Sequence, residues 1–356
     1  MLDNTGYKLT KEKKLTIGYF GGSITEGAGA SSDELCYRGR VTTWFRERYP
    51  DAEITPIQAA IGGTGTDLGM YRCEKDLTSR NPDLVFFEFA VNDSWMTYEN
   101  SAAQTETIFR KIRKKNPCAD IIVIFTTTGA IHNILASGGE YHSRSAHQAV
   151  AHHYGIPTID VGEVLRTRTL LEGGDFTRFT TDTVHPSDEG YEIYTDCITA
   201  WLEKNLAEGE AMTAHPERPL FCPKVHDNAR LVDITEACVA ADGFTLQETS
   251  LCGRYSHYME AVHPGDTMTF TFTGETGGLY WMLAKDGGDL TVQVDGGAPV
   301  TLRAWDHYCK SFNRASHAYV AMNLPYGTHT VTVTVAETKA EESEGTAIRI
   351  GAVLVS

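Results

Sequence analysis

The chain has 356 residues, of which 47 are acidic and 31 basic, and its formal net charge at pH 7 is -16. This length exceeds an average domain and predicts two. The acidic balance disfavours nucleic acid and anionic membrane surfaces as partners. No apolar run reaches the ~18 residues that a membrane helix needs, and the N-terminus lacks the apolar stretch of a secretory signal. The eight cysteines show no CxxC pair and no zinc spacing, so we expect reduced thiols, no metal site and a cytoplasmic protein.

Strand and helix patterns alternate along residues 15–206, and we expect the first domain to span residues 1–206. The apolar runs at 84–87 and 121–125 are typical of strands buried on both faces of a parallel sheet. The alternation therefore predicts an α/β domain, a three-layer α/β/α sandwich with right-handed crossovers. The predicted strands are 15–20, 53–58, 84–89, 121–126 and 157–160, and the predicted helices are roughly 36–49, 66–80, 101–116, 140–154 and 188–206.

The helical period ends near residue 207. We expect a linker over 207–226 and a second domain over 227–356, where short segments alternate between polar and apolar residues. Two Asp-Gly-Gly turns, at 286–288 and 295–297, have hairpin spacing. Short alternating strands with regular turns predict an all-β, jelly-roll-like sandwich. The alternating segments are 267–273, 290–294 and 329–335.

A serine flanked by glycines follows the first predicted strand. Ser23 lies in residues 21–27 (GGSITEG), at the carboxyl end of that strand, where open α/β sheets bind ligands. The preceding glycines permit a tight turn, and the N–H of Ser23 could then help to hold an oxyanion. A helix-capping serine or a phosphate loop is the alternative. The chain lacks GxxxxGK[ST] and the third glycine of a dinucleotide fingerprint, which disfavours the phosphate loop.

A serine hydroxyl needs an adjacent base to become a nucleophile, and His185 is the best candidate. It ends residues 182–185 (DTVH), just before a predicted helix start. At this spacing the Asp182 carboxylate could reach one imidazole nitrogen while the other nitrogen faces Ser23. The carboxylate would then set the tautomer and stabilise the imidazolium. A helix cap made by Asp182 is the alternative interpretation.

Two further elements could donate hydrogen bonds to an oxyanion. Gly63 follows the second strand and offers a backbone N–H, while Asn92 follows the third strand and offers its side-chain amide. Each such donor contributes roughly 3 kcal/mol in comparable sites. Taken alone, each of these two patterns is more typical of an ordinary turn than of an oxyanion donor. Together with Ser23 and His185, in this order and each at a strand end, they predict a serine hydrolase, whose chemistry needs no cofactor.

Residues 15–206 resemble the SGNH, or GDSL-type, hydrolases. Gly22 stands where many members carry aspartate, and Ala90 stands where glycine is usual. The matching blocks are residues 21–25 (GGSIT), 61–64 (IGGT), 89–93 (FAVND) and 182–185 (DTVH). The resemblance implies a catalytic triad of Ser23, His185 and Asp182, with an oxyanion hole formed by the N–H of Ser23, the N–H of Gly63 and the side chain of Asn92.

The two-domain order is similar to that of carbohydrate O-acetyl esterases of gut bacteria, above all the acetyl-mannan esterases with a C-terminal carbohydrate-binding-like sandwich. This resemblance implies removal of O-acetyl groups from plant-type oligosaccharides, with acetylated manno-oligosaccharides favoured as substrate. A short-acyl lipid esterase or lysophospholipase is the first alternative, and a non-catalytic glycan-binding protein is the second. Neither a monomer nor a homo-oligomer is excluded.

Aromatic and imidazole side chains are the candidates for substrate contact. Trp95 follows Asn92 closely, and His132 comes after the fourth strand. In the second domain, Trp305 and Tyr308 lie between predicted strands, where loops more often carry function. The neighbours Tyr280 and Trp281 lie within a strand pattern, so one of the pair should be buried and the other exposed.

Overall fold

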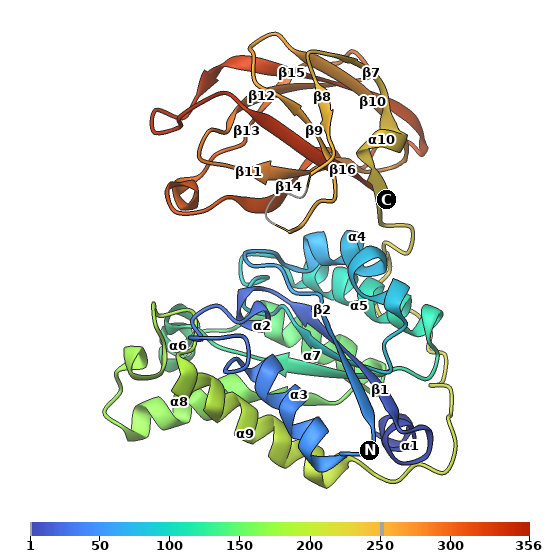
Figure 1. Cartoon of the computed structure of the whole chain (residues 1–356), viewed down its shortest axis with the longest axis vertical. Coiled ribbons are helices and arrows are strands. Elements are labelled where there is room, and N and C mark those ends of the chain that lie inside the picture. The colour runs from blue at the N-terminus through green and yellow to red at the C-terminus, as the bar shows by residue number, and fades with distance from the viewer. Residues whose placement is uncertain (1, 250–252) are drawn as a thin grey trace. The chain divides into compact units, whose positions relative to one another are not determined.

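The structure is a computed structural model that describes residues 2–249 and 253–356 (Figure 1). The chain forms two compact units, Met1–Asp227 and Asn228–Ser356. The expected linker 207–226 falls within the first unit.

The first unit is built on a five-stranded parallel sheet with strand order β2-β1-β3-β4-β5. Every residue of β3 and β4 is buried, as their continuous apolar runs predicted. Because the strands are parallel, their carboxyl ends meet at one edge of the sheet. The strands are β1 Lys14–Gly21, β2 Glu53–Gln58, β3 Leu84–Glu88, β4 Asp120–Phe125 and β5 Thr158–Asp160.

Helices cover both faces of this sheet and confirm the three-layer prediction. The contacts group α3, α8 and α9 on one face and α4, α5 and α7 on the other. Several short helices were not predicted, among them α8, which starts directly after β5 with Asp160 capping its N-terminus. The helices are α1 Asp3–Tyr7, η1 Lys8–Glu12, α2 Ser23–Glu26, α3 Tyr37–Arg48, α4 Thr66–Asp76, η2 Thr78–Arg80, α5 Tyr98–Lys115, α6 Gly129–Ala136, α7 His142–His153, α8 Val161–Leu171, η3 Phe176–Phe179 and α9 Asp188–Asn205.

Residues 207–227 run along the first unit as a strap. The backbone N–H groups of Phe221 and Cys222 each donate to the carboxylate of Glu106 at 2.7 Å. Glu106 is fully buried on α5 and also accepts a hydrogen bond from the Tyr154 hydroxyl at 2.6 Å. A buried carboxylate with three donors fixes the strap to the helix layer.

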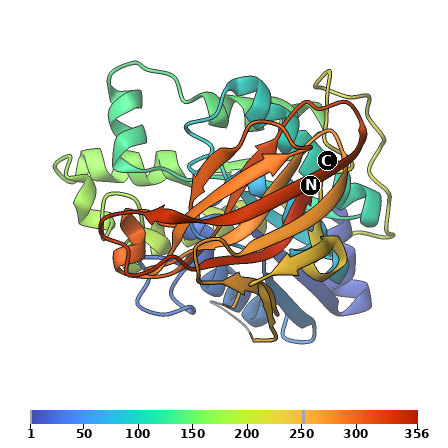
Figure 2. The same cartoon turned by 90° about the horizontal axis from the view of Figure 1, so that it is seen from above.

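The second unit is a sandwich of two antiparallel sheets, which confirms the all-β prediction (Figures 1 and 2). One sheet has the order β13-β12-β15-β10-β7. The other has β14-β11-β16-β9-β8, with β6 also paired to β16. The strands are β6 Arg230–Asp233, β7 Cys238–Asp242, β8 Thr245–Gln247, β9 Tyr258–Ala261, β10 Thr267–Gly274, β11 Gly277–Leu283, β12 Gly288–Val294, β13 Val300–Arg303, β14 Arg314–Ala321, β15 Gly327–Lys339 and β16 Ile348–Val355, with the short helices α10 Ile234–Ala237 and η4 His307–Lys310 between them.

Two local predictions for this unit were wrong. Tyr280 and Trp281 are both buried, although they point to opposite faces of β11. The Tyr280 ring packs 4.8 Å from the ring of Tyr255, while Trp281 belongs to the core between the sheets. Of the two expected hairpin turns, 295–297 joins the paired strands β12 and β13, but 286–288 leads from one sheet to the other.

Membrane-spanning helices and metal sites are absent from the part of the chain that the structure describes. None of its helices combines the length and apolar character needed to cross a bilayer. In residues 2–249 and 253–356, no three His, Cys, Asp or Glu side chains are grouped as metal ligands. The seven cysteines in these ranges are free thiols.

Glu106→Ala removes the acceptor of two strap N–H groups and of a tyrosine hydroxyl. A buried donor without an acceptor costs about 1–3 kcal/mol, so we expect the free energy of unfolding of the first unit to fall by about 2–5 kcal/mol. Hydrogen exchange of this unit in increasing urea measures the change. The exposed Glu99, on the same helix, is the matched control, and Glu99→Ala should shift stability by less than about 0.5 kcal/mol. Equal stability of the two variants would contradict the role of Glu106.

Candidate active site

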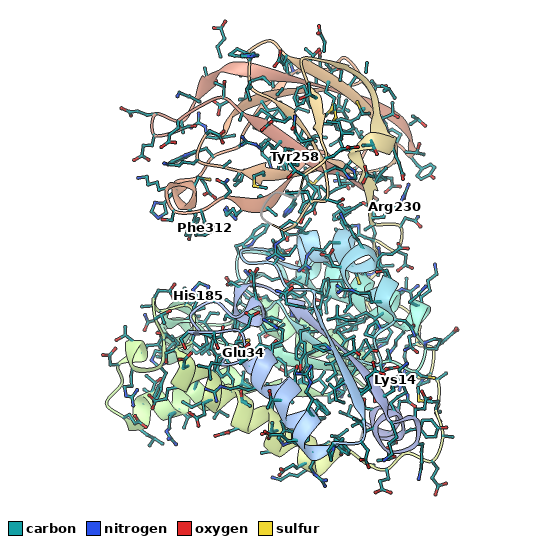
Figure 3. All side chains as sticks on the ribbon, viewed as in Figure 1. Lys14, Glu34, His185, Arg230, Tyr258 and Phe312 are labelled. Carbon is teal, nitrogen blue, oxygen red and sulfur yellow. The ribbon has the colours of Figure 1, made fainter. Side chains whose placement is uncertain are left out.

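Three side chains predicted to act together are in hydrogen-bond contact. Ser23 is the first residue of α2, directly beyond the end of β1. Its Oγ lies 2.8 Å from Nε2 of His185, although 162 positions separate the two residues. Nδ1 of the same ring lies 2.7 Å from Oδ2 of Asp182. His185 lies at the end of the sheet toward which β1 runs (Figure 3).

The loop of residues 182–185 is held in shape by the Asp182 carboxylate itself. Oδ1 of Asp182 accepts hydrogen bonds from the backbone N–H groups of Val184 at 3.0 Å and His185 at 2.8 Å. Thr183, in the middle, adopts a left-handed conformation with φ of 69°. Helix α9 is capped by the side chain of Ser187 instead, so Asp182 is not the helix cap that the alternative interpretation required.

The charge of Asp182 follows from these contacts. Partial burial by itself raises the pKa of this carboxyl. The backbone N–H groups of His185 and Val184 and the ring of His185 outweigh this effect, so the pKa lies below its usual value. The ionised carboxylate holds the Nδ1–H of His185, which leaves Nε2 to accept the Ser23 hydroxyl proton. The Asp182 side chain is 53% exposed, so solvent screens this pair.

The predicted oxyanion donors lie on elements that surround Ser23. A Cβ on Gly22 would lie 2.0 Å from Oδ1 of Asn92, so the Asn92 side chain packs against the backbone before Ser23. A Cβ on Gly62 would lie 3.5 Å from the Cβ of Ser23. The next residue, Gly63, has φ of 71°, a conformation that favours glycine. The structure thus brings the Gly63 loop and Asn92 to Ser23, as predicted.

Arg72, which no sequence motif marks, is part of this arrangement. Its side chain is fully buried, and its guanidinium stacks over the ring of Phe20 at 4.5 Å. Nη2 donates to the carbonyl of Gly21 at 3.0 Å, and Nη1 donates to the carbonyl of Ala59. Arg72 therefore ties the end of β1, which leads to Ser23, to the end of β2, which leads to Gly63. A lone arginine within a helix pattern carries no sequence signal for this contact.

The four candidates for substrate contact differ in exposure. Trp95 is 73% exposed on the loop after β3, and Tyr308 is 56% exposed on η4 of the second unit. Trp305 packs partly against the core of the sandwich. His132 is only 8% exposed, with its ring 5.6 Å from that of Phe176, so it has little surface to offer a ligand.

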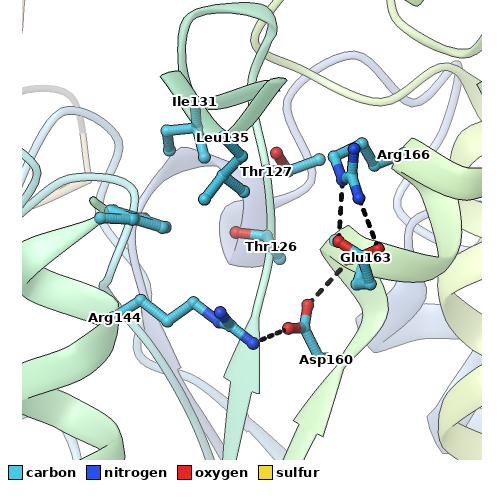
Figure 4. A pocket seen from close by; sticks show the side chains of 10 residues that line it. Thr126, Thr127, Ile131, Leu135, Arg144, Asp160, Glu163 and Arg166 are labelled. Carbon is cyan, nitrogen blue, oxygen red and sulfur yellow. Dashed lines mark hydrogen bonds and ion pairs between the residues drawn. The ribbon is translucent and has the colours of Figure 1, made fainter. Parts of the chain in front are cut away.

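A small pocket opens beside the ends of β4 and β5, and none of the predicted site residues lines it (Figure 4). Its charged side chains already pair with one another, Arg144 with Asp160 and Arg166 with Glu163. Each of these charges therefore already lies beside an opposite charge. The pocket also lacks a nucleophile and base in contact, so the chemistry belongs to the Ser23 site.

Known proteins resemble the chain in sequence and in fold. Residues 19–193 match the model of the GDSL-like lipase/acylhydrolase family. Two solved structures resemble both units, each with 24% sequence identity. One is a two-domain esterase, CEX, active on acetylated mannans, with a TM-score of 0.86 over 100% of this chain and 95% of that chain. The other is CEX co-crystallized with mannopentaose, with a TM-score of 0.82 over 96% of this chain and 90% of that chain.

The curated proteins include no match to the sequence. The family match covers the strands and loops that carry Ser23, Gly63 and Asn92. The first unit therefore matches the GDSL-like lipase/acylhydrolase family over residues 19–193, and the chain shares its two-unit fold with the CEX esterase.

Proposed function

We propose that the chain removes O-acetyl groups from an oligosaccharide by nucleophilic catalysis. One observation carries the chemistry: Ser23 Oγ is 2.8 Å from His185 Nε2, and Nδ1 of the same ring is 2.7 Å from the Asp182 carboxylate. A hydroxyl, a base and an orienting carboxylate in line form the arrangement that activates serine for attack on an ester.

In the first half of the reaction, His185 Nε2 takes the hydroxyl proton as Ser23 Oγ bonds to the acetyl carbonyl carbon. The carbonyl electron pair moves to oxygen, and the N–H groups of Ser23 and Gly63 and the amide of Asn92 stabilise the resulting oxyanion. Asp182 stabilises the imidazolium. When the intermediate collapses, the bond from carbon to the sugar oxygen breaks, and that oxygen receives the proton from His185. Ser23 now carries the acetyl group.

Water completes the turnover. His185 takes a proton from water as its oxygen attacks the acetyl-enzyme, and a second oxyanion forms in the same place. Collapse breaks the bond to Ser23 Oγ, which regains its proton from the imidazolium, and acetate leaves. Every proton and electron pair is accounted for by the ester, water and these side chains, so the cycle uses no cofactor.

The likeness to CEX supports a manno-oligosaccharide as the acetylated substrate. It extends over both units, including the sandwich, and CEX is active on acetylated mannans. Among the candidate contacts, Trp95 and Tyr308 present the exposed aromatic surface that can stack on a sugar ring. We therefore infer that each of these side chains, on its own unit, can bind a sugar ring.

Acetate release from acetylated mannan, xylan and pectin fragments, measured side by side, tests the substrate. We expect the highest kcat/KM on mannan fragments, because of the whole-chain likeness to CEX. On model esters, kcat/KM should fall when the acyl group is longer than acetyl. A preference for xylan or pectin would overturn the assignment of mannan as substrate and would leave the proposed chemistry intact. Activity that rises with acyl length would favour a lipid esterase.

Ser23→Ala removes the nucleophile. We expect kcat for acetate release to fall by about 10⁴-fold or more, since the remaining oxyanion donors cannot replace a covalent step. Thermal unfolding should be unchanged, because Ser23 lies at the open end of the sheet rather than in the core. A folded Ser23→Ala protein that still releases acetate at the wild-type rate would remove Ser23 from the mechanism. Oligosaccharide binding by a wild-type protein that releases no acetate would favour the glycan-binding alternative.

Asp182→Asn tests the orienting role of the carboxylate. The amide could donate to Nδ1 of His185 and favour the tautomer whose Nε2 carries the proton, which cannot accept from Ser23. We expect kcat to fall by about 10⁴-fold at neutral pH. The variant should still fold, because an amide oxygen can accept the two backbone N–H groups that Oδ1 now accepts. Activity within tenfold of wild type would show that the carboxylate is not needed for catalysis.

A further inference from the structure

Two carboxylates bind the backbone on either side of Gly63, one at Gly62 and one at Thr66. The loop that carries Gly63, residues 59–65, joins β2 to α4, and a hydrogen bond from the Thr64 hydroxyl to the Ile61 carbonyl at 2.8 Å closes a turn within it. The carboxylates belong to the segments that carry the other two oxyanion donors, so each grip connects two parts of the site.

The first grip comes from Glu26, three residues after Ser23 in the GGSITEG motif. Its Oε2 accepts the backbone N–H of Gly62 at 2.7 Å. Glu26 is the last residue of α2, and its own N–H donates to the Gly22 carbonyl at 2.9 Å. A Cβ on Gly62 would lie 2.8 Å from Oε2 of Glu26, so only glycine allows this approach without a shift. The contact fixes the peptide just before Gly63 relative to Ser23.

The second grip comes from Asp93, which directly follows Asn92. Its Oδ1 accepts the backbone N–H of Thr66 at 2.8 Å, and its Oδ2 accepts the Thr66 hydroxyl at 2.7 Å. Nε2 of His147 lies 2.9 Å from the same Oδ2, and both side chains are fully buried. This contact fixes the far end of the loop relative to Asn92.

We propose that Glu26 and Asp93 are positioning residues that hold the three oxyanion donors in register with one another. The inference rests on the proposed esterase function. Oxyanion stabilisation depends on donors that are fixed before charge develops, and a shift of a few tenths of an ångström weakens a hydrogen bond to the oxyanion. The αL conformation of Gly63 makes its N–H direction sensitive to the peptides on either side. Without the hydrogen bond at Gly62, the peptide that precedes Gly63 would no longer be fixed relative to Ser23.

Glu26 is the better residue to test, because it is half-buried and belongs to neither core cluster. Glu26→Ala removes the acceptor, while Glu26→Gln keeps an oxygen for the Gly62 N–H. Hydrolysis of p-nitrophenyl acetate probes the site without depending on the sugar. We expect Glu26→Ala to lower kcat by about 10–100-fold, somewhat less than the loss of a whole donor, with KM within about threefold. Glu26→Gln should stay within about threefold of wild type.

Glu34→Ala is the matched control, because this exposed glutamate lies in the loop after α2 and takes no part in the site (Figure 3). It should leave kcat unchanged. If Glu26→Ala lowers thermal stability markedly, Glu26→Asp replaces it, since a side chain shorter by one methylene withdraws the acceptor but keeps the charge. This variant should lose kcat in the same way. Asp93→Asn, which keeps an acceptor for Thr66, should lose less than Asp93→Ala.

The outcomes separate the two proposals. A folded wild-type protein that hydrolyses no acetyl ester overturns the proposed function and the inference with it. An active wild type with Glu26→Ala, or its substitute Glu26→Asp, within twofold of it overturns only the inference. Equal losses in Glu26→Ala and Glu26→Gln also overturn it, since the charge rather than the hydrogen bond to Gly62 would then matter.

Discussion

Ser23 can act as a nucleophile only if a base lies within hydrogen-bond distance of its hydroxyl, and this base comes from 162 positions further along the chain. The parallel sheet satisfies the constraint, because β1 delivers Ser23 to the same edge at which the loop before α9 delivers His185. Each loop at this edge then needs its own support. A sheet edge brings backbones together within several ångströms, whereas a hydrogen bond to a reacting atom needs much finer placement.

Buried or half-buried charged side chains supply that finer placement. Arg72 joins the ends of β1 and β2 through two carbonyls, and Glu26 and Asp93 hold the loop between β2 and α4 through two N–H groups. All three side chains bind backbone groups, although Asp93 also contacts the Thr66 hydroxyl and His147, and Arg72 also contacts Asp76. Charge-assisted hydrogen bonds are shorter and stronger than neutral ones, which suits groups that must hold a loop still. Asp182 does the same for the loop that carries His185.

Much of this site could be predicted, because strand ends and glycine-flanked polar residues are visible in the sequence. The five strands of the first unit, and with them Ser23, Gly63, Asn92 and His185, lie where the periodicity places them. The supporting contacts could not be predicted. Whether Arg72 faces the backbone of β1 or solvent depends on packing that a helix pattern does not encode. Likewise, the alternation of side chains along β11 predicts that one of Tyr280 and Trp281 is exposed. Both are buried, and the ring of Tyr255 packs against that of Tyr280, a contact that alternation does not encode.

Gly22 differs from the residue that is common in SGNH hydrolases, and its contact with Asn92 bears on this difference. Many SGNH hydrolases carry aspartate at this position, but here a Cβ would lie 2.0 Å from Oδ1 of Asn92 and 2.7 Å from its Cγ. A side chain at position 22 would therefore require the Asn92 side chain to shift from its present place. Glycine at 22 and the present orientation of Asn92 thus go together, because the asparagine packs closely against the backbone before the nucleophile.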